Sequence, residues 1–261
     1  MAKKITWKKI IRKLGRIRVR SRWLVNEVVD SLKSHVDLIC PICHLHDKAD
    51  KFKTYETNCI FSGGKLLRHE CPNCGVIFGT QRMLALSPEE LDREYAEHYF
   101  CYDEGDSTES EIRTFHYLNP KPEGIYLNYG CGKWSKSIQY AREQGFKLFG
   151  FEPYAMSDDE YIINDIEVLR SLKFDGIISN DVLEHLRYPD QTLSFMSNLL
   201  KDDGVMIHTT HCYNYACEYT RFHLFFFTGN SLKIICEKAG LSVENTDRID
   251  TKIFRKLLNV G

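Results

Sequence analysis

Histidine side chains in the second half of the chain could remove a proton from a substrate hydroxyl, because imidazole has a pKa of about 6.5 and accepts a proton near neutral pH. His185 and His211 each come shortly after a segment that reads as a buried strand. Ligands of doubly wound sheets bind beyond the carboxyl ends of the strands. We therefore expect His211 and His185 to be the catalytic candidates.

Two acidic residues, Asp181 and Glu184, follow the first of these strands. Either carboxylate could orient one of the histidines or bind substrate hydroxyls, and we include both among the catalytic candidates. His208 lies within an apolar strand pattern, which favours a structural role. His223 precedes an aromatic run, where a packing role is at least as plausible as a place beside the substrate.

Residues 125–152 read as an apolar strand, a glycine turn, a helix, a second strand and a carboxylate. Gly130 and Gly132 allow the backbone to turn sharply and to approach a ligand where a side chain would clash. Glu152 lies twenty residues past Gly132, where an acid that accepts hydrogen bonds from ribose hydroxyls is expected. The segment therefore predicts a nucleotide-type site with Glu152 on the ribose.

The ligand of this turn is expected to lack phosphates. A dinucleotide fingerprint would place a third glycine at position 135, with the following helix N-terminus aimed at a pyrophosphate. Ser135 stands there instead, and the bulky Trp134 precedes it. A nucleoside-type ligand without a pyrophosphate fits this turn better.

Two later segments continue the pattern. Residues 174–186 read as a strand that ends in Asn180 and Asp181, and residues 199–210 contain an Asp-Gly turn followed by another strand. With these motifs, the chain resembles the class I S-adenosylmethionine-dependent methyltransferases over roughly residues 120–245. The resemblance implies an α/β fold with a doubly wound, mostly parallel, Rossmann-like sheet.

The resemblance also implies a set of residues for S-adenosylmethionine. Glu152 would hold the ribose, Asp165 would lie near the adenine, and the turn at Asn180 would lie beside the methionine part. Asp165 could instead be an ordinary turn acid before a helix. Asn128 replaces the acid that this family often has at the end of the first strand, which predicts a different contact to the amino-acid end of the cofactor. The expected cofactor-binding residues are Tyr99, Asn128, Gly130, Cys131, Gly132, Glu152, Pro153, Asp165, Ile166 and Asn180.

Two Cys-x-x-Cys pairs give the most specific metal signal in the chain. They are Cys40 with Cys43 and Cys71 with Cys74. Four thiolates suit a closed, tetrahedral, structural zinc site, which leaves no open position for chemistry. The spacer between the pairs is long, but its strand-like residues and glycine turn suit a hairpin. His44 or His46 could replace one thiolate, and free thiols are the alternative to a metal site.

A helix is expected after the second cysteine pair. Ser87 is a good N-cap, Pro88 suits the first helical position and Glu90 completes a capping box, so the helix should run to about Tyr99. Such a cysteine module and aromatic helix ahead of a methyltransferase core resemble bacterial surface-polysaccharide (capsule or O-antigen) sugar methyltransferases. This resemblance implies a sugar or nucleotide-sugar substrate, for example a heptose or deoxysugar, and O-methylation. The alternatives are an RNA or protein methyltransferase that binds its substrate through the zinc module and basic arm, a sugar C- or N-methyltransferase, and a non-catalytic cofactor-binding protein.

Charge is unevenly placed along the chain. Residues 1–26 hold ten Lys or Arg and no acid, which leaves 25 basic and 36 acidic residues, a net charge of −11, for the remainder. Apolar residues recur in the arm at helical spacing, so an amphipathic helix could touch anionic lipid, nucleic acid or a neighbouring subunit, or pack on its own domain. The acidic remainder argues against nucleic acid as a partner.

No apolar run reaches the roughly 18 residues of a membrane span, and no signal-peptide segment is visible. We expect a cytoplasmic protein, with peripheral contact at the inner face of the membrane as the second hypothesis. The expected domains are a basic arm at 1–37, a zinc-ribbon-like module at 38–84, a helical connector at 85–119 and the methyltransferase domain at 120–261. The end of the chain, residues 241–260, could complete an antiparallel strand pair or stop short of it, and residues 254–260 could equally form a helix.

Overall fold

The computed structural model describes residues 7–32, 37–61, 64–102, 105–132, 136–152, 157–216 and 219–257. It divides into two compact units. The first consists of Met1–Gly105 together with Asn214–Gly229, and the second consists of Asp106–Tyr213 together with Asn230–Gly261. The chain therefore leaves the second unit after residue 213 and returns to it at residue 230.

The second unit is built on a seven-stranded sheet with the order β12-β13-β10-β9-β6-β7-β8. Neighbouring strands from β10 to β8 are parallel, and β13 is antiparallel to both β10 and β12. The strands are β6 Ile125–Tyr129, β7 Lys147–Phe151, β8 Ile162–Ile163, β9 Phe174–Asn180, β10 Leu200–Thr209, β12 Leu241–Asn245 and β13 Thr251–Lys256. The expected fold class, an α/β protein with a mostly parallel Rossmann-like sheet, is confirmed.

The two strands at the end of the chain settle a question that the sequence left open. Residues Leu241–Asn245 pair with Thr251–Lys256, and the latter strand also pairs with β10. The helical alternative for the end of the chain is therefore wrong within the described residues, because Phe254 is a fully buried strand residue.

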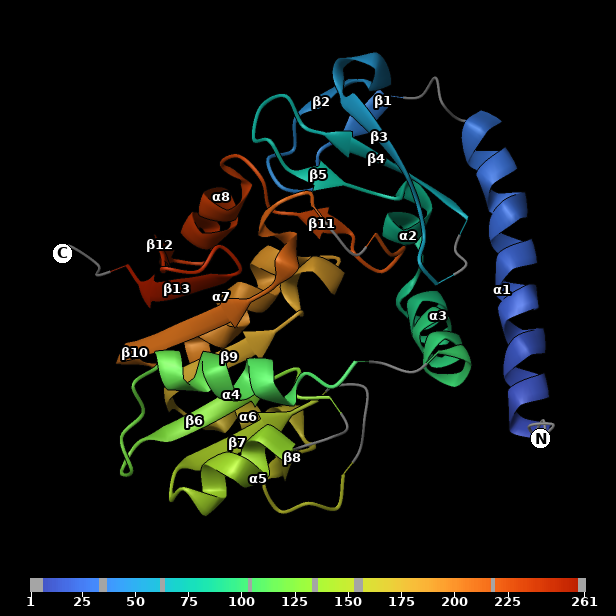
Figure 1. Ribbon diagram of the computed structural model, residues 1–261. Helices are drawn as coiled ribbons and strands as arrows, with labels where there is room; N and C mark the ends of the chain where they lie inside the picture. Colours follow the sequence, from blue (N-terminus) through green and yellow to red (C-terminus); the bar gives the residue numbers. More distant parts are fainter. Residues whose placement is uncertain are drawn as a thin grey trace. The chain divides into compact units, whose positions relative to one another are not determined.

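Within the described residues, five helices accompany this sheet, and Figure 1 shows them beside its strands. They are α4 Thr108–Tyr117, α5 Lys136–Glu143, α6 Ile166–Ser171, α7 Pro189–Leu199 and α8 Ser231–Lys238. Helix α4 buries Phe115 in a cluster with Tyr126, Ile138 and Leu148, which belong to β6, α5 and β7. This apolar contact fixes α4 against the first strands of the sheet, although the sequence suggested only a connecting helix there. Two short 3₁₀ turns, Leu183–His185 and His211–Tyr213, follow β9 and β10.

The first unit contains a four-stranded antiparallel sheet with the order β11-β5-β4-β3, and a separate pair, β1 with β2. Its elements are α1 Trp7–Leu32, β1 Asp37–Ile39, β2 His46–Lys48, β3 Lys53–Asn58, β4 Lys65–Glu70, β5 Ile77–Phe78, α2 Gln81–Ala85, α3 Pro88–Cys101 and β11 Phe225–Phe226. The expected hairpin between the cysteine pairs is present as β3 and β4. A short 3₁₀ turn, Ala49–Lys51, precedes β3.

Strand β11 comes from the distant segment 214–229. It pairs with β5, and the two lie side by side in Figure 1 although almost 150 residues separate them. Arg68 on β4 is fully buried and donates hydrogen bonds to the carbonyl oxygens of Thr220 at 2.6 Å and His223 at 3.2 Å. A long-range strand pair and a buried guanidinium thus tie this segment into the first unit.

Helix α3 begins as the sequence predicts. The Ser87 hydroxyl accepts from the backbone N–H of Glu90, and the Glu90 carboxylate accepts from the backbone N–H of Ser87. This capping box satisfies two N–H groups at the start of the helix. Among the described residues, none of the helices is both long enough and apolar enough to cross a membrane.

Candidate active site and metal centre

The glycine turn lies between the carboxyl ends of β6 and β7. Gly130 and Gly132 have φ values of +76° and +63°, in the left-handed region that glycine enters without strain. The Gly130 N–H donates to the Phe151 carbonyl at 2.8 Å, and the Gly132 N–H donates to the Glu152 carboxylate at 3.0 Å. Glu152 is thereby fixed against the turn, where the sequence places a ribose-binding acid.

Gly130 has a second reason to lack a side chain. A Cβ atom at this position would lie 2.6 Å from a methyl group of Val182, in the loop after β9. Val182 is branched at Cβ and cannot easily rotate away. The loop after the fourth parallel strand thus closes directly onto the turn after the first, and the two expected cofactor motifs meet at this contact.

Cys131, between the two glycines, does not expose its side chain at this turn. Its side chain is buried, and its Sγ atom would meet a Cβ placed at Gly150 on the neighbouring strand at 2.7 Å. Burial raises the pKa of this thiol far above its usual range, so the group stays neutral.

A buried carboxylate beneath the turn was not expected from the sequence. Glu111 of α4 accepts hydrogen bonds from the Asn128 amide at 2.7 Å and from the hydroxyls of Ser137 and Ser107, both at 2.5 Å. Asn128 occupies the position where related enzymes often carry an acid. Helix α4 therefore brings the Glu111 carboxylate to the end of β6, where Asn128 stands in place of an acid.

Two buried acceptor atoms at this edge have no hydrogen-bond partner within the described residues. They are the side-chain carbonyl oxygens of Asn128, near the end of β6, and Asn180, at the end of β9. The Asn180 amide donates to Ser110 at 3.1 Å and to Thr114 at 2.9 Å, both on α4. Buried polar atoms normally find partners. A ligand with an ammonium group, which carries several N–H donors, suits this pair of strand ends.

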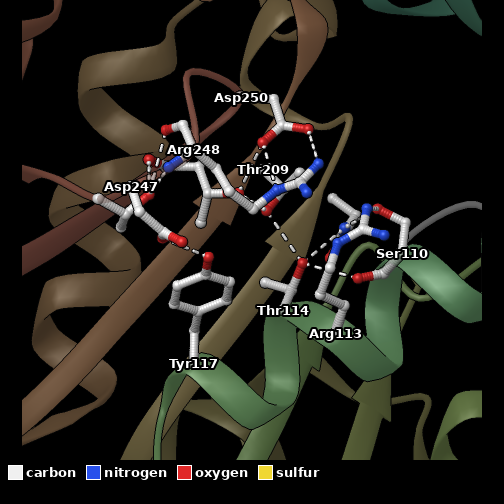
Figure 2. A network of polar contacts seen from close by, with 11 residues as sticks. Ser110, Arg113, Thr114, Tyr117, Thr209, Asp247, Arg248 and Asp250 are labelled. Carbon is white, nitrogen blue, oxygen red and sulfur yellow. Dashed lines mark hydrogen bonds and ion pairs between the residues drawn. The ribbon is translucent and has the colours of Figure 1, made fainter.

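Figure 2 shows how polar side chains of α4 continue toward the last strands of the sheet. The Thr114 and Thr209 hydroxyls lie 2.9 Å apart, and the Tyr117 hydroxyl donates to Asp247 at 2.6 Å. Arg248 binds the Asp250 carboxylate with two N–H groups, at 2.9 and 2.6 Å. Helix α4 is thus hydrogen-bonded to β10 and to the turn between β12 and β13.

The catalytic candidates differ in exposure. Asp181 and His211 are exposed beyond the ends of the neighbouring strands β9 and β10, and the Asp181 N–H donates to the Thr209 carbonyl at 2.9 Å. Glu184 is fully buried and accepts from the Thr210 hydroxyl. Burial, with a further contribution from Asp181, raises the pKa of the Glu184 carboxyl well above its usual range. Glu184 is therefore a neutral group beneath the edge and does not line it.

His208 has the structural role that its apolar surroundings suggested. It is fully buried, and burial lowers its pKa to about 3, so the ring is neutral. Its Nε2 accepts from the Leu183 N–H at 3.3 Å, which leaves the ring proton on Nδ1 to bond the Tyr213 hydroxyl at 2.8 Å. The half-buried His185 ends the 3₁₀ turn after β9.

Asp250 is an acidic neighbour of His211 that the sequence pattern did not reveal. The Asp250 backbone carbonyl accepts from the Thr210 N–H at 2.8 Å. Hydrogen bonds from Arg248 lower the pKa of its carboxyl, and the His211 charge contributes to this shift.

The four cysteines of the two pairs meet at one point in the first unit. The Sγ atoms of Cys40 and Cys74 lie 3.6 Å apart, those of Cys43 and Cys71 lie 3.5 Å apart, and all four lie within 4.8 Å of one another. Tetrahedral zinc with Zn–S bonds of about 2.3 Å requires S···S distances of about 3.8 Å. The sulfur positions therefore fit a four-cysteine zinc site. This group of potential ligands includes neither His44 nor His46.

Both cysteine pairs sit on equivalent turns. The N–H of His44 donates to the Cys40 carbonyl at 3.0 Å, and the N–H of Gly75 donates to the Cys71 carbonyl at 2.9 Å. His44 and Gly75 both have positive φ, +60° and +78°. The pKa values of the thiols also differ. A hydrogen bond from Cys74 lowers the pKa of Cys40 to about 5, and burial raises the pKa of Cys71 to about 11.

The family model that matches this chain is that of a methyltransferase domain, over residues 95–246. This match spans more than half of the chain. The chain belongs to this methyltransferase family. The expectation that it is an S-adenosylmethionine-dependent methyltransferase is confirmed.

Solved methyltransferases share this fold. The 1,6-didemethyltoxoflavin-N1-methyltransferase of Burkholderia thailandensis, determined with 1,6-didemethyltoxoflavin and S-adenosylhomocysteine, is similar at 14% identity and a TM-score of 0.51, over 71% of this chain and 96% of that one. A TehB-like S-adenosylmethionine-dependent methyltransferase of Corynebacterium glutamicum is 18% identical with a TM-score of 0.39, over 63% of this chain and 97% of that one. The mitomycin 7-O-methyltransferase MmcR is 13% identical with a TM-score of 0.42, over 67% of this chain and 60% of that one. None of the curated proteins matches the chain.

The remaining residues predicted to bind the cofactor lie in different parts of the structure. Asp165 caps α6 by accepting from the Glu167 N–H at 2.8 Å, as an ordinary turn acid does, and Ile166 beside it is partly exposed. Tyr99 lies on α3 in the first unit, next to Tyr95 in a stacked pair. Pro153 falls outside the described residues. The roles of Asp165, Ile166, Tyr99 and Pro153 at the cofactor stay predictions.

Proposed function

We propose that this methyltransferase transfers a methyl group from S-adenosylmethionine to a hydroxyl of a sugar or nucleotide-activated sugar, in capsule or O-antigen biosynthesis. The observation that carries the proposal is the exposed pair of Asp181 and His211 at the ends of neighbouring strands. A sugar hydroxyl is a poor nucleophile at neutral pH, so its methylation needs a base within hydrogen-bond reach. Histidine supplies the base and a carboxylate binds neighbouring hydroxyls.

S-adenosylmethionine would supply an activated methyl group and a good leaving group. The protein then has to position the acceptor and take its proton. Glu152 would hold the ribose, and the backbone of the Gly130 to Gly132 turn would face the ligand. The unpartnered oxygens of Asn128 and Asn180 would accept from the ammonium of the amino-acid part.

His211 would accept the hydroxyl proton in this proposal. The imidazole takes the proton as the new bond to carbon forms, and the Asp250 carboxylate is its acidic neighbour. Asp181, which is exposed at the end of β9, would bind a second hydroxyl of the acceptor. His185 is the alternative base, because it also follows a strand end but is only half-buried.

The test is methyl transfer to a panel of nucleotide-activated sugars, with the methyl position in the product identified by NMR. Replacing His211 by Ala should lower kcat by 10²-fold or more, the usual contribution of a general base, while cofactor affinity stays the same. His116→Ala is the matched control, because His116 is an exposed histidine on α4. Transfer only to RNA, to protein or to a carbon or nitrogen atom would overturn the sugar O-methylation proposal.

We also propose that Cys40, Cys43, Cys71 and Cys74 bind one structural Zn²⁺. A closed set of four thiolates leaves no position for substrate, so the metal would stabilise the first unit. The purified protein should contain one equivalent of zinc by atomic emission spectrometry. Cys71→Ser should abolish binding, whereas Cys59→Ser should not, because Cys59 is a buried cysteine outside the cluster. Full zinc content in Cys71→Ser would contradict the assignment.

A further inference from the structure

Helix α1 has two faces with different surroundings. One face packs on the first unit through Val19, Trp23 and Asn26, which are all buried. Gly15 belongs to this face, since a Cβ there would lie 2.6 Å from the Cys101 sulfur of α3. Arg22 forms ion pairs with Glu94 and Glu97 of α3 at 2.7 and 2.5 Å, so the helix is fixed in orientation.

The other face of α1 is apolar and exposed. Trp7, Leu14 and Ile17 are 77%, 60% and 53% exposed, which is high for large apolar side chains that follow one another at helical spacing. The stripe continues along the whole helix. Its members are Trp7, Ile10, Ile11, Leu14, Ile17, Leu24, Val25, Val28 and Val29. Contiguous exposed apolar surface of this kind marks an interaction site.

Cationic residues border this stripe. On a helix with 100° between residues, Lys13 and Arg20 lie along one margin of the stripe, and Arg18 lies among its apolar residues near the other margin. All three are exposed. The half of α1 that carries them, residues 7–22, contains no acid. The helix thus presents apolar side chains flanked by positive charge.

A groove adjoins the same helix. It has a volume of about 840 Å³ and lies between α1 and the helices α2 and α3. Leu14 and Phe100 contribute apolar surface to it. Its charged lining combines guanidinium groups with carboxylates, from Arg18, Arg22, Arg82, Arg93, Glu90, Glu94 and Glu97. The carboxylates offset most of the positive charge, so the groove by itself does not select an anionic ligand.

We propose that α1 binds the surface of a bilayer that contains anionic phospholipid. The helix would lie in the plane of the interface, with its apolar stripe in the headgroup and acyl boundary and its cations on lipid phosphates. Amphipathic helices that bind in this way combine a strong apolar face with Lys and Arg on the polar face and a Trp near the interface.

The positive charge of α1 favours an anionic lipid surface over a second copy or nucleic acid as the partner of its exposed apolar face. A second copy would place two acid-free cationic segments against each other, which like-charge repulsion opposes. Nucleic acid would satisfy the cations, but it offers nothing to the apolar stripe, and the rest of the chain is strongly acidic. An anionic bilayer complements both the cations and the apolar side chains.

Co-sedimentation of the full chain with vesicles tests the proposal. One vesicle population contains only phosphatidylcholine, and the other also contains about a third phosphatidylglycerol. We expect at least tenfold tighter partition onto the anionic vesicles, and weaker binding as salt is raised, because salt screens the attraction. Equal partition onto both, or no binding to either, would overturn the proposal.

Variants separate the two contributions. Leu14→Glu should reduce partition by about tenfold or more, and Lys13→Glu with Arg20→Glu should reduce it by roughly fivefold per residue. The matched controls are Ile249→Glu and Lys121→Glu with Lys147→Glu, which make the same changes at exposed positions of the second unit. These controls should bind as the unaltered chain does. Circular dichroism checks that each variant keeps its helices.

Two further measurements complete the test. Light scattering of the free protein gives its oligomeric state, and fluorescence of a Trp7-only variant, with the other tryptophans replaced by Phe, reports insertion as a blue shift on anionic vesicles. A stable dimer that Leu14→Glu dissociates and that does not bind vesicles would overturn the proposal in favour of a second copy. Tight RNA binding without vesicle binding would overturn it in favour of nucleic acid.

Discussion

Glu111 shows how a single buried side chain can take over a position that another residue usually fills. Asn128 lies near the end of β6, where the resemblance to this family implies an acid. Glu111 reaches this amide from α4 and accepts hydrogen bonds from it and from two serine hydroxyls. The carboxylate thereby fixes the strand end from which the glycine turn begins, and we expect it to position the turn for the cofactor.

Replacing Glu111 by Gln should disturb this arrangement. The new amide would turn N–H donors toward groups that are themselves donors, and a lost hydrogen bond to a charged group is worth about 1.5 to 3 kcal/mol. We expect S-adenosylmethionine affinity, measured by calorimetry, to fall about tenfold. Glu109→Gln on the exposed side of the same helix is the control. Adding Asn128→Asp to Glu111→Gln should restore most of the affinity, and unchanged binding in Glu111→Gln would refute the positioning role.

Glu184 leads to a pH-dependent prediction. Burial raises its pKa in the folded protein, whereas the unfolded chain ionises this residue near pH 4.3. Above that pH, Glu184 is deprotonated in the unfolded state but stays protonated in the folded state. The contribution of Glu184 to the free energy of unfolding therefore falls as pH rises. Glu184→Gln keeps an acceptor for Thr210 and removes the titration. Urea denaturation from pH 4 to 8 should show the variant gaining stability relative to the unaltered chain, and Glu123→Gln, at an exposed position, should show no such trend.

At the scale of elements, the edge strand β11 depends on a side chain outside it. Arg68 satisfies two backbone carbonyls of the segment before β11 from a fully buried position. Arg68→Met keeps much of the apolar stem but leaves these carbonyls unpaired, which should cost about 2 to 4 kcal/mol. Hydrogen exchange of residues 219–229 should then accelerate, together with a lower denaturation midpoint. Arg93→Met, at an exposed site on α3, should change stability by less than about 0.5 kcal/mol.

Elements defined by local patterns were predictable from the sequence. Ser87 and Glu90 form the expected capping box, and Gly130 forms the expected turn, because both features depend on residues a few positions apart. Glu111 and Asp250 were missed for the opposite reason. Each acts on a group that only the tertiary fold brings near it, and neither carries a local pattern that distinguishes it from a surface acid.

At the scale of the whole molecule, the chain crosses between its two units more than once. The segment 214–229 is inserted between β10 and α8 of the second unit, yet it provides an edge strand to the first. A domain boundary drawn along the sequence near residue 120 would therefore leave this segment without its partners. The sequence-based division assigned all of 120–261 to one domain, because a two-residue strand carries too little pattern to reveal its pairing.

This interleaving makes a prediction about truncation. A chain that begins at residue 106 retains the aromatic run at the end of 214–229 but lacks β5 and β4, so the buried Phe225 and Phe226 lose their covering. We expect this fragment to aggregate in size-exclusion chromatography, because exposed apolar strands associate. Replacing 214–229 by a Gly/Ser linker of equal length in the same fragment should yield a monomer that binds S-adenosylmethionine, since the sheet and the glycine turn lie wholly in the second unit.

The same linker in the full chain is the control, and it should destabilise the first unit while cofactor binding persists. A well-folded monomer from the unmodified fragment would show that β11 is dispensable to the burial of this segment.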